Sequence, residues 1–155
     1  MPFVQVALRR DLPVSGLTNW LKPRWLILLS ATEPEVRRRF SLMHEFKHIL
    51  DHPFIGHLYP DYGGVAHDQR AELAADYFSA CVLMPKRLVK RAYFGGQQNL
   101  SDLAAEFGVS EVAMRYRLHQ LKLVDRPQRC VLPYRSTGDI KGYLRRSREL
   151  EPMAA

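Results

Sequence analysis

The sequence reads RFSLMHEFKHILDH over residues 39–52, and this stretch decides the fold. At its centre, His44–His48 form an H-E-x-x-H motif. Apolar side chains recur around the motif at helical spacing, which predicts a helix with one apolar face. Thr32 can cap the start of this helix and Pro53 ends it. We therefore expect one helix over residues 32–52.

The spacing of the two histidines places both imidazoles on one face of that helix, one turn apart. Such a pair can bind a divalent metal ion, and Glu45 can serve as general base toward a metal-activated water. The alternative is a surface helix with two solvated histidines. A catalytic zinc site usually takes a third protein ligand. Four residues are candidates for that position: His52, His57, His67 and Glu72.

The four candidates differ in their place on the predicted elements. His52 lies on the same helix as the motif, and a rigid helix cannot wrap three successive turns around one ion. Glu72 begins a second predicted helix, over residues 68–84, which could pack antiparallel to the first. Asp76, one turn later, could accept the outer N–H of a ligating histidine. A solvated helix face is the alternative for both carboxylates, and spacing alone leaves the choice open.

Composition limits the class of protein. The chain has 155 residues, of which 46% are hydrophobic and 25% charged, as in one globular domain with a small appendage. Its net charge of +7 would suit nucleic acid, an anionic membrane surface or an acidic partner. Two cysteines are too few for a disulfide framework. We find neither a secretory signal nor a membrane-length apolar run, so we expect a cytoplasmic protein without a membrane partner.

The remaining elements are predicted from short-range signals. Strands are expected over residues 3–8, after Gly16 and over 24–29. Residues 53–67 read as a loop, and residues 99–124 as two short helices split at 107–110. A further strand is possible over 130–134. We divide the chain into a core over 1–95, a helical pair over 96–125 and a basic tail over 126–155.

Two blocks of the chain resemble one family. The first is RFSLMHEFKHILDH over residues 39–52, and the second is ELAADYFSACVLMP over residues 72–85. They are similar, in the same order, to the R-F-T-x-A-H-E-x-x-H-x-x-x-H and E-x-x-A-N-x-F-A-A-x-L-L-M-P blocks of ImmA/IrrE-type metallo-endopeptidases. Asp76 stands where that family commonly has Asn, and it keeps a hydrogen-bond acceptor there.

The resemblance implies both a fold and a set of ligands. The expected fold class is α+β, with a zincin-like metallopeptidase core in which a short antiparallel sheet packs on the H-E-x-x-H helix and a second ligand helix. Carried over by position, it implies that His44, His48 and Glu72 bind zinc, that Glu45 is the catalytic base and that Asp76 supports a ligand. Zn²⁺ is the expected cofactor, although the same ligand set also suits Mn²⁺ or Fe²⁺.

The resemblance also implies an activity and a partner. It predicts a zinc-dependent endopeptidase that hydrolyses a protein substrate, expected to be a helix-turn-helix transcriptional repressor. Such a reaction needs a donor for the developing oxyanion. The loop offers four unranked candidates for this donor: His57, Tyr59, Tyr62 and His67. The alternative function is a DNA-binding regulator or toxin–antitoxin component with a structural or degenerate metal site.

Two further hypotheses concern surfaces. The segment after residue 99 looks like a helix-turn-helix, and Arg115, Arg117 and His119 are the side chains it would offer to phosphate or to an acidic partner. We favour packing or protein docking over DNA binding for this pair. The strand over 24–29, or its neighbour after Gly16, could form the sheet edge along which a peptide substrate adds as a further strand, with plain core as the alternative.

Overall fold

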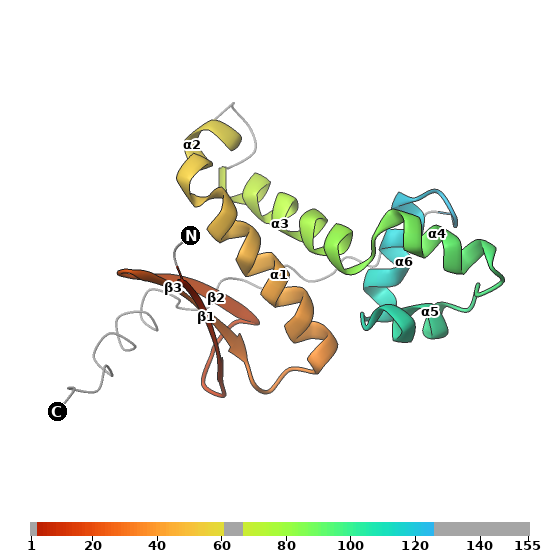
Figure 1. The fold of residues 1–155 in the computed structure, drawn as a ribbon, viewed down its shortest axis with the longest axis horizontal. Helices are drawn as coiled ribbons and strands as arrows, with labels where there is room; N and C mark the ends of the chain where they lie inside the picture. Colours follow the sequence, from red (N-terminus) through yellow and green to blue (C-terminus); the bar gives the residue numbers. More distant parts are fainter. Residues whose placement is uncertain (1–2, 61–66, 126–155) are drawn as a thin grey trace.

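A computed structural model describes residues 3–60 and 67–125 of the chain. It is a mixed α+β structure in which helix α1 (Glu35–Asp51) lies between a three-stranded sheet and helix α3 (His67–Leu83) (Figure 1). A short 3₁₀ turn, η1 (His52–Phe54), and helix α2 (Ile55–Leu58) follow α1. Among the described residues, no helix combines the length and the apolar character needed to cross a membrane.

The sheet contains β1 (Phe3–Arg9), β2 (Gly16–Leu21) and β3 (Arg24–Ser30), in the order β1-β3-β2. β2 pairs with β3 in antiparallel register, with Thr18 opposite Ile27. β1 pairs with β3 in parallel register, with Val6 opposite Ile27. The prediction of an antiparallel sheet was therefore wrong for one of the two pairings. β1 and β3 can run in the same direction because β2, which runs in the opposite direction, lies between them in the sequence.

The central strand β3 is buried on both faces. Trp25, Ile27 and Leu29 form an apolar cluster with Ile49 of α1. The other face packs Leu28 against Leu12. A strand that is covered on both faces is expected to be apolar along its length, and the sequence of β3 is continuously apolar over residues 25–29. Residues 25–29 therefore belong to the core, whereas Arg24 is exposed, and the free edges among the described strands belong to β1 and β2.

Helix α1 begins later than the sequence predicted. Pro34, and not Thr32, precedes the first helical residue, and no side chain caps this end. The last helical residue is Asp51, next to the predicted end at His52. The amide of His52 still bonds back to the carbonyl of His48, so the helical path continues into η1. The motif therefore lies well inside regular helix.

Three further helices form a separate apolar cluster at the end of α3 (Figure 1). These are α4 (Lys86–Phe94), α5 (Leu100–Phe107) and α6 (Glu111–Gln120). The side chains of Asn99 and Ser110 accept hydrogen bonds from the first turns of α5 and α6, respectively. The two short helices thus occur where the sequence predicted them. The three-part division of the chain stays a prediction, and the strand expected over 130–134 lies outside the described residues.

Two arginines connect this cluster to the helices packed on and beside the sheet. Arg117 of α6 is only 4% exposed, and its Nε donates to the carbonyl oxygen of Met84 at the end of α3, at 2.9 Å. Arg39 of α1 donates to the carbonyl of Gly108 at 2.9 Å, at the end of α5. Cations are favourable at helix C-termini, where the last carbonyls lack helical partners. The burial of Arg117 corrects the expectation that it is offered to a partner.

We expect Arg117→Ala to lower the free energy of unfolding by about 2–4 kcal/mol, because it opens space in an apolar cluster and leaves the Met84 carbonyl without its donor. Arg115, an exposed residue two positions earlier, provides the control. Arg115→Ala should cost less than about 0.5 kcal/mol. Urea unfolding followed by circular dichroism measures both. Equal midpoints for the two variants would contradict this role of Arg117.

Candidate metal centre

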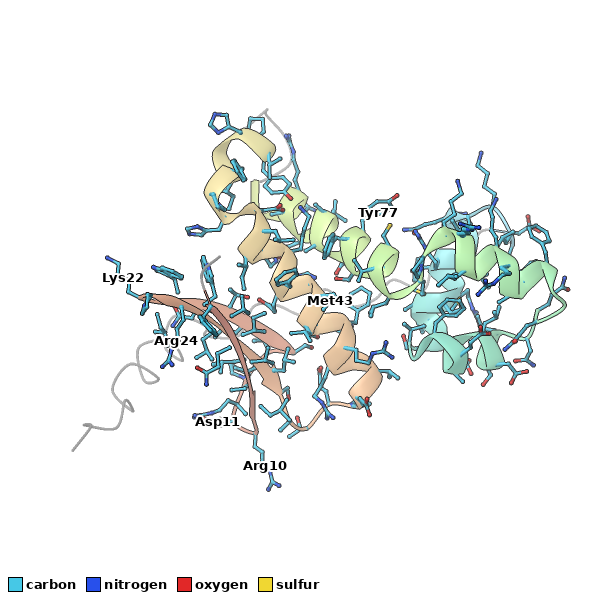
Figure 2. The ribbon with its side chains drawn as sticks, in the orientation of Figure 1. Arg10, Asp11, Lys22, Arg24, Met43 and Tyr77 are labelled. Carbon is cyan, nitrogen blue, oxygen red and sulfur yellow. The ribbon has the colours of Figure 1, made fainter. Side chains whose placement is uncertain are left out.

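The site is built where α3 packs against α1. Small residues at four-residue spacing, Ala71, Ala75 and Ser79, are buried on α3, and a helix with such a stripe can approach its neighbour closely. The opposite side of α3 faces solvent: Tyr77 is 59% exposed and points away from α1 (Figure 2). This orientation turns Glu72 and Asp76 toward the histidines of α1.

Three side chains converge on one point. The Nε2 atoms of His44 and His48 are 3.1 Å apart. One oxygen of Glu72 is 3.1 Å from Nε2 of His44, and the other is 3.2 Å from Nε2 of His48. A tetrahedral ion with bonds of about 2.0–2.1 Å places its ligand atoms about 3.3 Å apart. The three side chains therefore fit a single metal ion of zinc's size and coordination, and a His/His/Glu set has the donor chemistry for it.

The far side of His44 is also fixed. Its Nδ1 donates to a carboxylate oxygen of Asp76 at 2.9 Å, which leaves Nε2 directed at the other ligands. Burial lowers the pKa of His44, but hydrogen bonds with Asp76 and Glu72 outweigh it and raise the pKa to about 10. The same contacts with His44 and His48 hold the pKa of the Glu72 carboxyl well below its usual range. The Glu72 carboxyl therefore stays in its charged form, and His44 favours its charged form beside it when no metal is bound.

The site is open on one side. The side chains of His44 and His48 are 16% and 26% exposed, whereas that of Glu72 is 59% exposed. The protein covers most of the two imidazoles, whereas solvent reaches the carboxylate. A further molecule can therefore approach the three ligand atoms from the side of Glu72. A closed structural site would instead surround its ion with protein ligands.

Glu45 turns away from α3 toward β2. Its Oε2 accepts a hydrogen bond from the hydroxyl of Thr18 at 2.7 Å. Burial raises the pKa of the Glu45 carboxyl above its usual value; the Thr18 hydrogen bond and the nearby histidines act in the opposite direction without cancelling it. A carboxylate with a raised pKa is a better proton acceptor near neutral pH than an exposed one.

The other histidine candidates lie elsewhere. The ring of His52 packs edge-on against Trp25, with the ring centroids 4.8 Å apart. His57 is exposed on α2, and the side chain of His67 lies outside the described residues. Within the described part of the chain, Glu72 is thus the candidate that joins His44 and His48.

The structure also removes one of the candidates for the oxyanion donor. Tyr59 is buried, and its hydroxyl donates to Asp51, which also pairs with Lys47. Burial and the Asp51 carboxylate raise the pKa of Tyr59 to about 12. Tyr59 therefore fixes the turn after α1 and is not presented to a substrate. Tyr62 lies outside the described residues.

Two residues at the site were missed by the sequence analysis, Gly16 and Thr18. Both lie on β2 and contact Glu45. Gly16 was noted only as the point after which a strand begins, and nothing in the sequence marks Thr18. The contact depends on how the sheet packs on α1, which is a tertiary arrangement that no local pattern reports.

Fold and site together define an α+β protein with a candidate His/His/Glu metal centre between two helices. The Peptidase_M78 family, described as the IrrE N-terminal-like domain, matches residues 7–119, and the chain belongs to this family. The match confirms the resemblance to ImmA/IrrE proteins seen in the sequence. No curated protein sequence matches the chain significantly.

The fold is also found among solved structures. A Mycobacterium tuberculosis transcriptional regulator superposes with a TM-score of 0.60 at 18% sequence identity. The match covers 74% of this chain and 36% of the regulator, so this chain corresponds to little more than a third of that protein's length.

We expect the purified protein to bind one Zn²⁺ per chain, measured by competition with a chromophoric chelator. His48→Ala should weaken this binding at least about 100-fold, and Asp76→Ala about 10–100-fold through loss of the partner of His44. His52→Ala, just after the end of α1, is the matched control and should bind like wild type. If His48→Ala retains full affinity, the three side chains form only an ion-pair cluster.

Proposed function

We propose that this protein is a zinc-dependent endopeptidase that hydrolyses peptide bonds in a protein substrate. The observation that carries the proposal is the convergence of His44, His48 and Glu72 with Glu45 adjacent on α1. Membership of a peptidase family supports the same reading. In this reading the core is zincin-like, and α5 and α6 form a helix-turn-helix-like pair.

Each residue has a distinct role in the proposed site. His44, His48 and Glu72 would hold Zn²⁺, for which Mn²⁺ or Fe²⁺ could substitute. A bound Zn²⁺ would supply Lewis acidity toward the scissile carbonyl and would lower the pKa of water. Asp76 keeps His44 in the tautomer that leaves Nε2 free to ligate.

Glu45 would move the proton. As the carboxylate with the raised pKa, it accepts a proton from the attacking water and delivers it to the leaving amine. The donor for the oxyanion is left open between His57, Tyr62 and His67, since Tyr59 is engaged with Asp51. A structural metal site would have no use for the Glu45 carboxylate.

The substrate we propose is an extended stretch of a protein chain. β2 is a sheet edge and lies against α1 next to Glu45, so a peptide added along β2 would run beside the site. Backbone pairing along an edge holds a peptide with little dependence on its sequence. The family resemblance points to a helix-turn-helix transcriptional repressor as the substrate, and a cytoplasmic setting suits that partner.

The second candidate is a DNA-binding regulator with a structural or degenerate metal site. The net charge of +7 and the exposed Arg115 on α6 favour it. The burial of Arg117 weakens it, because one of three expected phosphate contacts is used inside the protein. We therefore propose that the helical pair serves packing or protein docking.

We expect Glu45→Gln to retain Zn²⁺ and to cut more slowly by about 10²–10⁴-fold, because an amide cannot accept the proton. Zinc-loaded wild type and variant are incubated with purified helix-turn-helix repressors from the same genome, and the fragments are identified by mass spectrometry. Glu35→Gln, at the exposed start of α1, is the control and should cut like wild type. A zinc-loaded wild type that cuts nothing the Glu45 variant spares would refute the proposal.

A salt titration separates the two candidate functions. For the peptidase, we expect affinity for a short DNA duplex to be weak and unchanged in Arg115→Ala. A DNA reader would instead bind tightly at low salt, lose affinity steeply as salt rises, and lose part of that slope in the variant. Fluorescence anisotropy with a labelled duplex measures both quantities.

A further inference from the structure

Glu45 is held by the strand beside it as well as by its own helix. The hydroxyl of Thr18 lies 2.7 Å from Oε2 of Glu45 and 3.2 Å from the main-chain oxygen of the same residue. Thr18 is half-buried on β2, across the interface between the sheet and α1. One hydroxyl therefore contacts both the backbone and the carboxylate of a single residue from a different element.

Gly16, also on β2, lies against the side chain of Glu45. A Cβ atom added at Gly16 would lie 2.8 Å from Cγ and 2.9 Å from Oε1 of Glu45. Real Cβ contacts are essentially never shorter than about 3 Å, so any larger residue would displace the Glu45 side chain or the strand. The requirement for glycine is one of space, since the backbone of Gly16 is not among those with positive φ. The Glu45 side chain thus fills the space that the missing Cβ leaves.

We infer that Thr18 and Gly16 of β2 are positioning residues that fix the carboxylate of Glu45, so the strand proposed to hold the peptide also orients the group that acts on it. The inference rests on the proposed function in taking Glu45 as the general base. Oε2 is bound to Thr18 and Oε1 lies beside Gly16, so β2 fixes the orientation of the whole carboxylate. Small misplacements of a reacting group cost large factors in rate, which gives the contact a catalytic consequence.

The charges around Glu45 explain why its carboxylate needs a fixed hydrogen-bond partner. Its carboxylate is attracted by His44 and His48, the residues proposed to bind the metal. A carboxylate without another partner would turn toward these two histidines. The Thr18 hydroxyl offers a fixed donor on the opposite side and keeps the side chain against β2.

The test uses a matched pair of variants at one position. Thr18→Val keeps the shape and removes the hydroxyl, whereas Thr18→Ser keeps the hydroxyl. With a protein substrate that wild type cuts, we expect Thr18→Val to lower kcat about 10–100-fold, leaving KM and Zn²⁺ affinity within about 3-fold. Thr18→Ser should restore kcat to within about 3-fold of wild type. Gly16→Ala should resemble Thr18→Val in kcat.

A second readout does not depend on activity. In metal-free protein carrying ¹³C-labelled glutamate carboxyls, the Glu45 resonance is the one lost in Glu45→Gln. We expect Thr18→Val to move this resonance and Thr18→Ser to leave it near the wild-type position. Circular dichroism confirms that each variant is folded.

Three outcomes would overturn the inference. The Glu45 resonance could stay unmoved in Thr18→Val, the kcat of Thr18→Val could equal or exceed that of wild type, or Thr18→Ser could fail to restore kcat. A failure of the proposed function gives a different result, in which wild type and Glu45→Gln cut alike. The carboxyl resonance still decides in that case whether Thr18 holds Glu45.

Discussion

The packing of α1 between the sheet and α3 is the constraint on which the rest of the structure depends. The helical repeat gives one helix several faces, and each face of α1 contacts a different part of the structure. Leu42, Phe46 and Ile49 face the apolar side of β3. His44 and His48 face Glu72 on α3. Glu45, between the two histidines in sequence, faces Thr18 on β2. A helix buried on one side only could not combine ligands from α3 with a carboxylate set against the sheet.

The helical cluster at the end of α3 is joined to this arrangement through helix ends. Arg117 reaches the carbonyl after the last residue of α3, and Arg39 reaches the carbonyl of Gly108 after α5. Gly108 has a positive φ of 58°, and an added Cβ would fall 1.8 Å from Nη1 of Arg39. The turn therefore favours glycine there, and any larger residue would also displace the Arg39 side chain. Both helices that carry proposed ligands, α1 and α3, are thus linked to α5 and α6, so a partner docked on the pair would be held in a defined place relative to the site.

Local signals in the sequence predicted much of the fold and the site. The H-E-x-x-H spacing, the second block after residue 72 and the split at residues 107–110 are short-range features, and the structure has helices at the first two and on both sides of the third. The parallel pairing of β1 and the burial of Arg117 were not predictable, and the sequence left open whether residues 24–29 or the strand after Gly16 forms an edge. Each depends on which segments pack together across many residues. Arg117 is buried in the helical cluster, and its hydrogen bonds to the Met84 carbonyl and to Oε1 of Gln120 explain why a cation is accepted there.

Charge at the proposed site is opposite in sign to that of the whole chain. The chain carries +7, and basic side chains such as Arg10, Lys22 and Arg24 lie at the ends of the sheet, away from α3 (Figure 2). At the site, Glu45, Glu72 and Asp76 gather around two histidines, and the charge of Glu72 contributes to the raised pKa of Glu45. Carboxylates placed this close repel one another unless a cation lies between them. In the metal-free protein the charged form of His44 lies between Glu72 and Asp76, and a divalent ion bound by His44, His48 and Glu72 would take over the task of balancing these carboxylates.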